Sequence, residues 1–260
     1  MTSIPPTRPH ARPSTAPAYV LTTVGPWAAA LAAGRCAGDD LLDELLALEM
    51  PTTVLDAQTG ATIGWLELAR RAQSFSVRLP APGDPAGLPP GPASAAAFTV
   101  GEALVVETDA DVALIVPERD PDRAPAWMSH ALPTTTAAPP IGPGEARAAL
   151  LDAIGEATSV LAALPGVRDT TPTTLRTELA AQVTRFTPLL PPGADARAVD
   201  VAGLAAQVLG TIALADARLV KFGIASSHAQ DSADQLRGLT TVARGTLAAA
   251  VNRVIVEYQR

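Results

Sequence analysis

The sequence predicts an α+β protein: an N-terminal antiparallel sheet of four to five strands with one or two helices, followed by a C-terminal helical bundle. Two observations lead to this class. Alternating and β-branched runs are confined to residues 52–116, whereas apolar residues recur at spacings of three and four from residue 145 onward. All 25 prolines lie at or before Pro192. The rest of the chain is therefore free to form long helices, and we expect a long antiparallel helical hairpin there.

The composition suits a folded chain with a large core. Hydrophobic residues make up 48% of the 260 residues and charged residues 17%, which excludes disorder throughout. The single cysteine, Cys36, excludes an intrachain disulfide and a multi-cysteine metal site, and we expect it to be a small buried hydrophobic residue. The net charge is −7 and the longest basic run is Arg70-Arg71, so we expect no nucleic-acid partner.

The first 36 residues contain two segments of different character. Residues 1–17 are rich in proline and are expected to form a disordered arm. Residues 18–36 are apolar, but Pro26 and Arg35 interrupt the pattern of an export signal, and whether they act as an atypical one stays open. No stretch has the length and apolarity of a membrane span, so we expect a cytoplasmic protein that does not contact a membrane.

Residues 18–117 are expected to form the α+β domain. We expect a first helix within 20–33, starting at Pro26, and a second helix over 41–49 with its leucines on one face. The expected strands are 52–55, 61–66, 73–79, 103–107 and 112–116. Residues 98–100 could begin the fourth of these strands, and residues 80–92 are expected to form a long loop.

A second proline-rich stretch, residues 118–144, is expected to be a linker that docks on a domain surface through Trp127 and Met128. Residues 145–260 are then expected to form the helical bundle. Its first two helices are indicated by apolar seams on either side of the Pro165-Gly166 break.

The long hairpin is indicated by two further seams. Their apolar members are Val201, Leu204, Val208, Ile212, Ala215, Leu219 and Phe222, then Leu236, Leu239, Ala243, Leu247, Val251, Val254 and Tyr258. Residues 226–231 form the polar break between the two helices, and Ser232 with Gln235 fits a capping box for the final helix. Small residues are expected to let the two helices approach closely, namely Ala205, Ala213, Gly238 and Gly245.

The residue patterns of the common enzyme classes are missing from the sequence. The three histidines, His10, His130 and His228, are far apart and follow no metal-ligand spacing, and no glycine-rich phosphate loop or GxSxG elbow occurs. The run Ser226-Ser227-His228, followed by Asp231, is interpreted as helix-turn chemistry rather than a catalytic triad. We therefore predict no catalytic, cofactor-binding or metal-ligating residues, and no cofactor.

Two function classes remain open. The first is a non-enzymatic interaction protein, an adaptor or chaperone-like chain whose helical surface binds another protein chain or a second copy of itself. The second is a small-molecule or enzymatic site in the crevice between sheet and bundle, where Arg70, Arg71 or Arg123 would meet an anionic ligand. The scarcity of reactive groups favours the first class.

Overall fold

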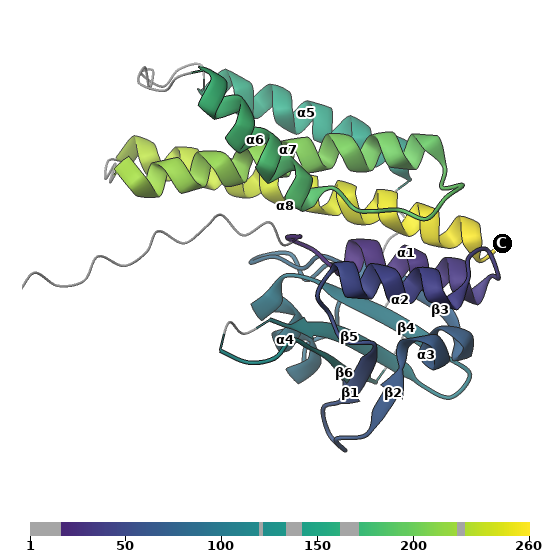
Figure 1. The fold of residues 1–260 in the computed structure, drawn as a ribbon. Helices are drawn as coiled ribbons and strands as arrows, with labels where there is room; N and C mark the ends of the chain where they lie inside the picture. The colour runs from purple at the N-terminus through teal and green to yellow at the C-terminus, as the bar shows by residue number, and fades with distance from the viewer. Residues whose placement is uncertain (1–16, 120–121, 134–141, 162–171, 223–226) are drawn as a thin grey trace, which may run out of the picture.

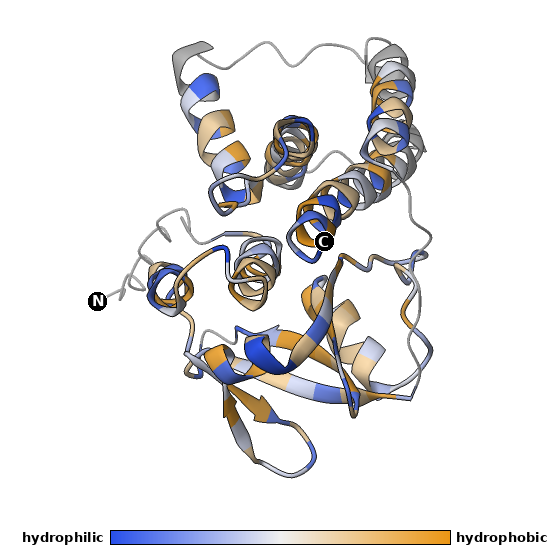
Figure 2. Cartoon of the chain, turned by 90° about the vertical axis from the view of Figure 1, so that its right-hand side faces the viewer, coloured by the Kyte–Doolittle hydropathy of each residue, from blue (hydrophilic) through white to orange (hydrophobic). Residues whose placement is uncertain are grey.

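The computed structural model has the expected α+β fold, built in layers (Figure 1). It describes residues 17–119, 122–133, 142–161, 172–222 and 227–260. The sheet forms one layer, the long C-terminal helices form the opposite layer, and α1 (Leu21–Ala32) and α2 (Gly38–Ala47) lie between them. Figure 2 shows the same order of layers from the side. The predicted arm, residues 1–17, lies outside the described residues except for Pro17.

The sheet has six strands rather than four to five, and it is mixed rather than antiparallel. The strands are β1 (Thr53–Asp56), β2 (Thr62–Gly64), β3 (Ala72–Arg78), β4 (Ala103–Thr108), β5 (Val112–Glu118) and β6 (Ala126–Leu132). Their order across the sheet is β2-β1-β6-β5-β4-β3. Each neighbouring pair is antiparallel except β1 and β6, which run parallel in the register Val54 with Trp127.

The expectation that residues 118–144 form a linker was wrong for the segment that becomes β6. Trp127 is fully buried in the sheet, where its indole N–H donates to the carbonyl of Pro51 over 2.8 Å. Its ring meets Trp65 edge to face, with 5.2 Å between the ring centroids. The strand was predicted to be a linker because prolines lie on both sides of it, and proline-rich sequence is typical of irregular linkers.

Two expected strand segments are helical. Residues 98–100 end α4 (Pro92–Val100), which covers the face of the sheet opposite α1. The second expected strand stops at Gly64, and α3 (Trp65–Arg71) follows it directly. Both helices are short, and a pattern of a few apolar residues does not distinguish a strand from a buried helical turn.

Helix α1 is buried almost all round, because both outer layers pack on it. A Cβ added at Gly25 would lie 3.0 Å from side-chain atoms of Leu104 and Val77 in the sheet and 3.4 Å from Ile255 in the last helix. The helix begins at Leu21, not at Pro26 as expected; Pro26 lies inside it. At its start a distant side chain, the carboxylate of Glu102, accepts the N–H of Val20 just before the helix and that of Leu21, its first residue.

The C-terminal layer contains the predicted helices, α5 (Pro143–Leu161), α6 (Pro172–Phe186), α7 (Ala196–Phe222) and α8 (Ser227–Tyr258). The α8 seam is confirmed: its members from Leu236 to Val254 are buried. Helix α8 begins at Ser227, so Ser232 lies inside the helix and the predicted capping box is wrong. Gly238 and Gly245 have open space beside them; the close helix approach is at Gly210, where α6 crosses α7.

One apolar core joins the two halves of the chain. It includes Val77 and Leu104 from the sheet, α1, and Leu247 and Ile255 from α8. Residue 144 therefore marks a change from sheet to helices along the chain. The parts before and after it contribute side chains to the same hydrophobic core.

The edge of the sheet at β3 is closed by a side chain of α8. The Asn252 amide oxygen accepts the N–H of Val77 over 2.7 Å, and its amide nitrogen donates to the Val77 carbonyl over 2.9 Å. An amide supplies one donor and one acceptor, as a neighbouring strand would. This pairing both blunts the edge and ties α8 to the sheet.

Replacing Asn252 by alanine is expected to lower the free energy of unfolding by about 2 kcal/mol, because two partly buried hydrogen bonds are lost. Asn252→Asp keeps an acceptor but no donor and should also destabilise. Urea unfolding measures both changes. An unchanged midpoint for Asn252→Ala would contradict the role assigned to this amide.

Candidate functional site

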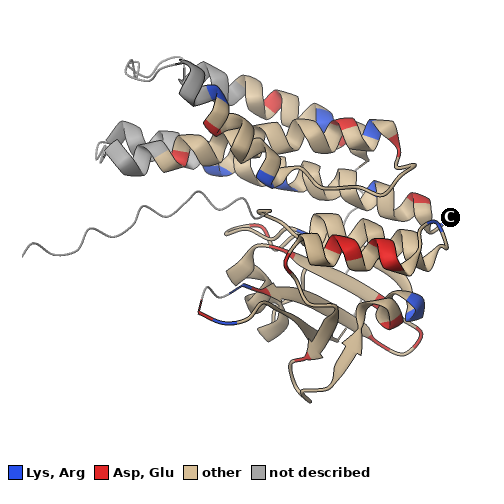
Figure 3. Cartoon of the chain, in the orientation of Figure 1, with Lys and Arg blue, Asp and Glu red and all other residues tan. Residues whose placement is uncertain are grey.

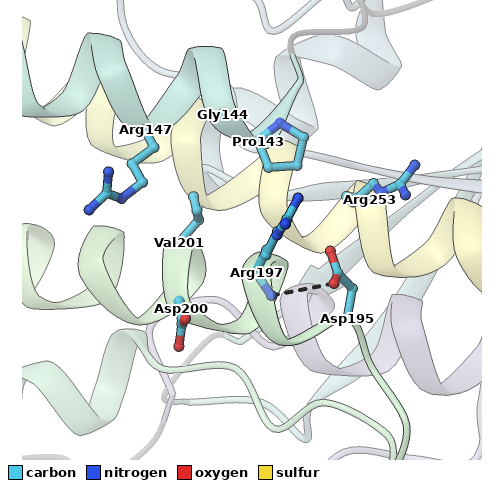
Figure 4. A pocket seen from close by; sticks show the side chains of 8 residues that line it. All are labelled: Pro143, Gly144, Arg147, Asp195, Arg197, Asp200, Val201 and Arg253. Atoms are coloured by element: carbon cyan, nitrogen blue, oxygen red, sulfur yellow. Dashed lines mark hydrogen bonds between the residues drawn. The ribbon is translucent and has the colours of Figure 1, made fainter.

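A hollow of about 480 Å³ combines charged side chains with a concave shape where three helices meet. Helices α5 and α7 both begin there, and α8 passes between them and the rest of the protein (Figure 4). The lining residues are Pro143, Gly144, Arg147, Asp195, Arg197, Asp200, Val201 and Arg253. We call this feature the arginine hollow.

The arginines of the hollow come from three different helices. Arg197 reaches from α7 across the hollow, Arg147 lies on α5 at one side, and Arg253 lies on α8 at the other (Figure 4). Arg253 is paired with Glu257 over 2.6 Å. Within the described part of the chain, the guanidinium groups of Arg147 and Arg197 have no hydrogen-bond or ion-pair partner. Two positive groups thus stand open to a ligand.

The backbone adds to this positive potential, and two acids reduce it. Helix starts carry a partial positive charge because their first N–H groups are unpaired, and the first turns of α5 and α7 line the same hollow. Asp195 accepts the backbone N–H of Arg197 at 3.4 Å, so it partly caps α7. Asp200 is exposed at the rim. Because Arg253 is paired with Glu257, the formal charges of Arg147 and Arg197 are matched by those of Asp195 and Asp200, and the two helix starts supply the remaining positive potential.

Apolar groups lie below and beside these charges. Pro143 and Val201 are part of the lining. Leu151 and Val256 are 43% and 41% exposed, and each lies one helical turn beyond an arginine of the hollow. A surface with an apolar floor and positive rim matches a ligand that presents an apolar group between acids.

A second group of polar residues lies where the start of α1 meets the two layers, with Glu102 fully buried and the polar residues around it half-buried. The Glu102 carboxylate accepts the N–H groups of Val20 at 3.1 Å and Leu21 at 2.8 Å. Burial raises the pKa of Glu102 to about 7, although these hydrogen bonds and the nearby Arg119 and Arg244 act to lower it.

The arginines near Glu102 hold backbone carbonyls. Arg244 of α8 donates to the carbonyls of Pro80 and Gly101 and lies 5.1 Å from the ring centre of Tyr19. Arg119 donates to the Pro17 carbonyl over 2.9 Å. Both guanidinium groups bind backbone carbonyls, so this group of residues connects the layers of the structure. Burial also raises the pKa of Tyr19.

The structure places the residues proposed from sequence away from the hollow. Arg71 pairs with Glu67, and Arg123 pairs with Glu118. Arg70 is exposed on α3. The space between sheet and bundle is filled by α1 rather than left open near these arginines.

The cysteine and the histidines considered in the sequence analysis either make local contacts or lie outside the described residues. Cys36 is half-buried against the core, and its thiol donates to the carbonyl of Trp27 at 3.7 Å; burial raises its pKa. His130 lies in β6, opposite Leu114. His10 and Ser226 fall outside the described residues, and so do the side chains of His228 and Asp231.

Sequence reasoning missed the arginines of the hollow because single arginines carry little signal. Arg147 and Arg197 each follow a Pro-Gly break by a few residues, at Pro143-Gly144 and Pro192-Gly193. A basic residue is unusual in a first helical turn, and this rule would have marked Arg197, the second residue of α7, but not Arg147, the fifth residue of α5. Their meeting at one point depends on how α5 packs beside α7.

Two further features concern metal ligands and apolar helices among the described residues. No three His, Cys, Asp or Glu side chains among them are grouped as metal ligands. One helical stretch, Ala196–Ala217, is long and apolar enough by composition to cross a membrane, which the sequence analysis did not expect; 56% of its apolar window is buried. Its apolar side packs on the neighbouring helices, as in the core helix of a folded bundle.

Comparison with known proteins gives two matches to family models. The model described as "Rv1486c-like protein, N-terminal domain" matches residues 21–143, and the one described as "Rv1486c-like protein, C-terminal domain" matches residues 144–248. The division between them falls at the start of α5, where the sheet gives way to helices. No curated protein and no solved structure matches the chain significantly.

Proposed function

The chain belongs to the Rv1486c-like family, and we propose that it is a non-enzymatic protein-interaction protein that binds an acidic, amphipathic segment of a partner in the arginine hollow. The observation that carries the proposal is the convergence of three arginines from three helices on one hollow, two of them without partners among the described residues. The proposal keeps the expected protein partner and cytoplasmic location.

Three properties of the hollow support this ligand class. Arginine forms strong, directional hydrogen bonds to carboxylates and is enriched at protein interfaces. The apolar floor offers burial for one hydrophobic side chain of the ligand. The helices that present the arginines are anchored in the core through Leu150, Ala205 and Val251, so the arginines project from a fixed frame.

A peptide-display selection on the full chain tests the proposal. The wild-type protein is expected to enrich segments that combine Asp or Glu with a leucine-like residue at helical spacing. The double variant Arg147→Glu with Arg197→Glu should lose that enrichment, with binding weakened about tenfold or more, because two attractive charges become repulsive.

Arg70→Glu serves as a control for the charge change, because Arg70 is exposed on α3, away from the hollow. Its selection should match that of the wild type. Equal enrichment by the double variant, or no preference for acidic segments in the wild type, would overturn the proposal. Circular dichroism and the melting temperature establish that each variant is folded.

A second candidate is a small anionic ligand, favoured by the hollow's volume of about 480 Å³, which falls within the range of small-molecule sites. A panel of phosphorylated and carboxylated metabolites would then raise the melting temperature of the wild type but not of the double variant. This outcome, together with no selected peptide, would replace the first proposal by the second.

A further inference from the structure

The outer face of α2 carries the pattern that the arginine hollow is suited to bind. Asp39, Asp43 and Leu46 are spaced four and three residues apart, so they form one stripe on the helix. Both acids are exposed, and Leu46, at 74%, is the most exposed of the large hydrophobic residues of the described chain. Figure 3 shows acidic residues along this helix. Among the described residues no hydrogen bond or ion pair engages Asp39 or Asp43, so this acidic stripe and its exposed leucine face solvent.

The stripe is held rigidly. On the opposite side of α2, Leu41 and Leu45 are fully buried in the core. Asp40 is engaged locally, since its carboxylate accepts the N–H of Ala37 over 2.7 Å at the start of the helix. Docking of the stripe would therefore cost little conformational entropy, because the helix is already formed.

We infer that the occupant of the arginine hollow is the α2 stripe of a second copy of this chain, an inference that rests on the proposed function of the hollow. Asp39 and Asp43 would face Arg147 and Arg197, and Leu46 would cover the apolar floor at Val201. Asp195 and Asp200 line the same hollow and repel the acids of the stripe. This repulsion weakens the contact, so we expect a reversible association rather than a permanent one.

The contact joins two different surfaces of the molecule, so each copy offers one hollow and one stripe. Such a head-to-tail contact leaves a free surface at each end of a pair and builds a ring or a longer chain. It also depends on ionic strength, because the exposed charges are screened by salt.

Sedimentation velocity of the full chain over a range of concentrations tests the inference. The wild type is expected to self-associate at low salt and to dissociate as salt is raised. The hollow variant, Arg147→Glu with Arg197→Glu, and the stripe variant, Asp39→Arg with Asp43→Arg, should each associate about tenfold or more weakly.

Mixing the two variants gives the decisive result. The acidic hollow of one variant then faces the basic stripe of the other, and the unchanged hollow faces an unchanged stripe, so the mixture should regain association. A monomeric wild type, or a mixture that stays monomeric, would overturn the inference. Acidic peptides that still bind the hollow of a monomeric protein would leave the proposed function standing, whereas loss of both would remove both.

Discussion

The free energy of unfolding is expected to fall by roughly 3 kcal/mol as the pH rises from 4.5 to 7, through the single carboxyl of Glu102. The ordinary pKa of this group is 4.5, and burial raises it to about 7 in the folded protein. Between these values the folded state holds a proton that the unfolded state has released. The stabilising contribution is thus fully present below pH 4.5 and is lost as the pH rises through 7.

Glu102→Gln removes the titration while leaving an acceptor for one of the two N–H groups at the start of α1. Denaturant unfolding of both proteins from pH 4.5 to pH 8 separates Glu102 from other titrating groups. The difference between the two free energies should change with pH in this window and be flat above it. A constant difference would show that the folded protein does not hold the extra proton.

Two glycines of α7 are expected to respond to alanine in opposite directions. A Cβ at Gly210 would lie 2.7 Å from the backbone nitrogen of Val183 and 2.9 Å from its Cα, so α6 must move away. Overpacking of this kind costs about 1–3 kcal/mol, which exceeds the gain in helix propensity. Gly203 has no atom within 4 Å of the same position, and Gly203→Ala should stabilise the protein by about 0.5–1 kcal/mol.

Thermal and urea unfolding of the two variants measure these changes, with Gly203→Ala as the matched control in the same helix. The melting temperature of Gly210→Ala should fall below that of the wild type, while that of Gly203→Ala should rise. Stabilisation by both substitutions would mean that α6 does not approach α7 as closely as the structure has it.

The regular parts of the fold were predictable because their causes are local. The seam of α8 from Leu236 to Val254 is an apolar repeat on a proline-free segment, and helical geometry alone places its members on one side. Strand β3 alternates from Ser74 to Val77 as expected of a half-buried strand, whereas Arg78, expected on its polar side, is buried. Residues 98–100 and β6 were misassigned because their final conformation depends on what they pack against.

The candidate site could not be predicted from the sequence, because it also depends on packing between distant segments. The sequence contains Arg147, Arg197 and Arg253 as isolated arginines, each at least 50 residues from the next, and no spacing rule connects them. Their convergence follows from the packing of α5 and α7 against α8. The α2 stripe, by contrast, lies within a single helix, so its spacing can be read from the sequence while its exposure cannot.

By itself, the amino-acid sequence determined the fold class, the long helical hairpin and the lack of familiar catalytic motifs, since periodicity and motif spacing are properties of neighbouring residues. The tertiary structure decided the parallel pairing of β6 with β1, the burial of Glu102 at the start of α1 and the meeting of three arginines at one hollow. Each of these joins residues distant in the chain, and their positions are set by how the layers share one core.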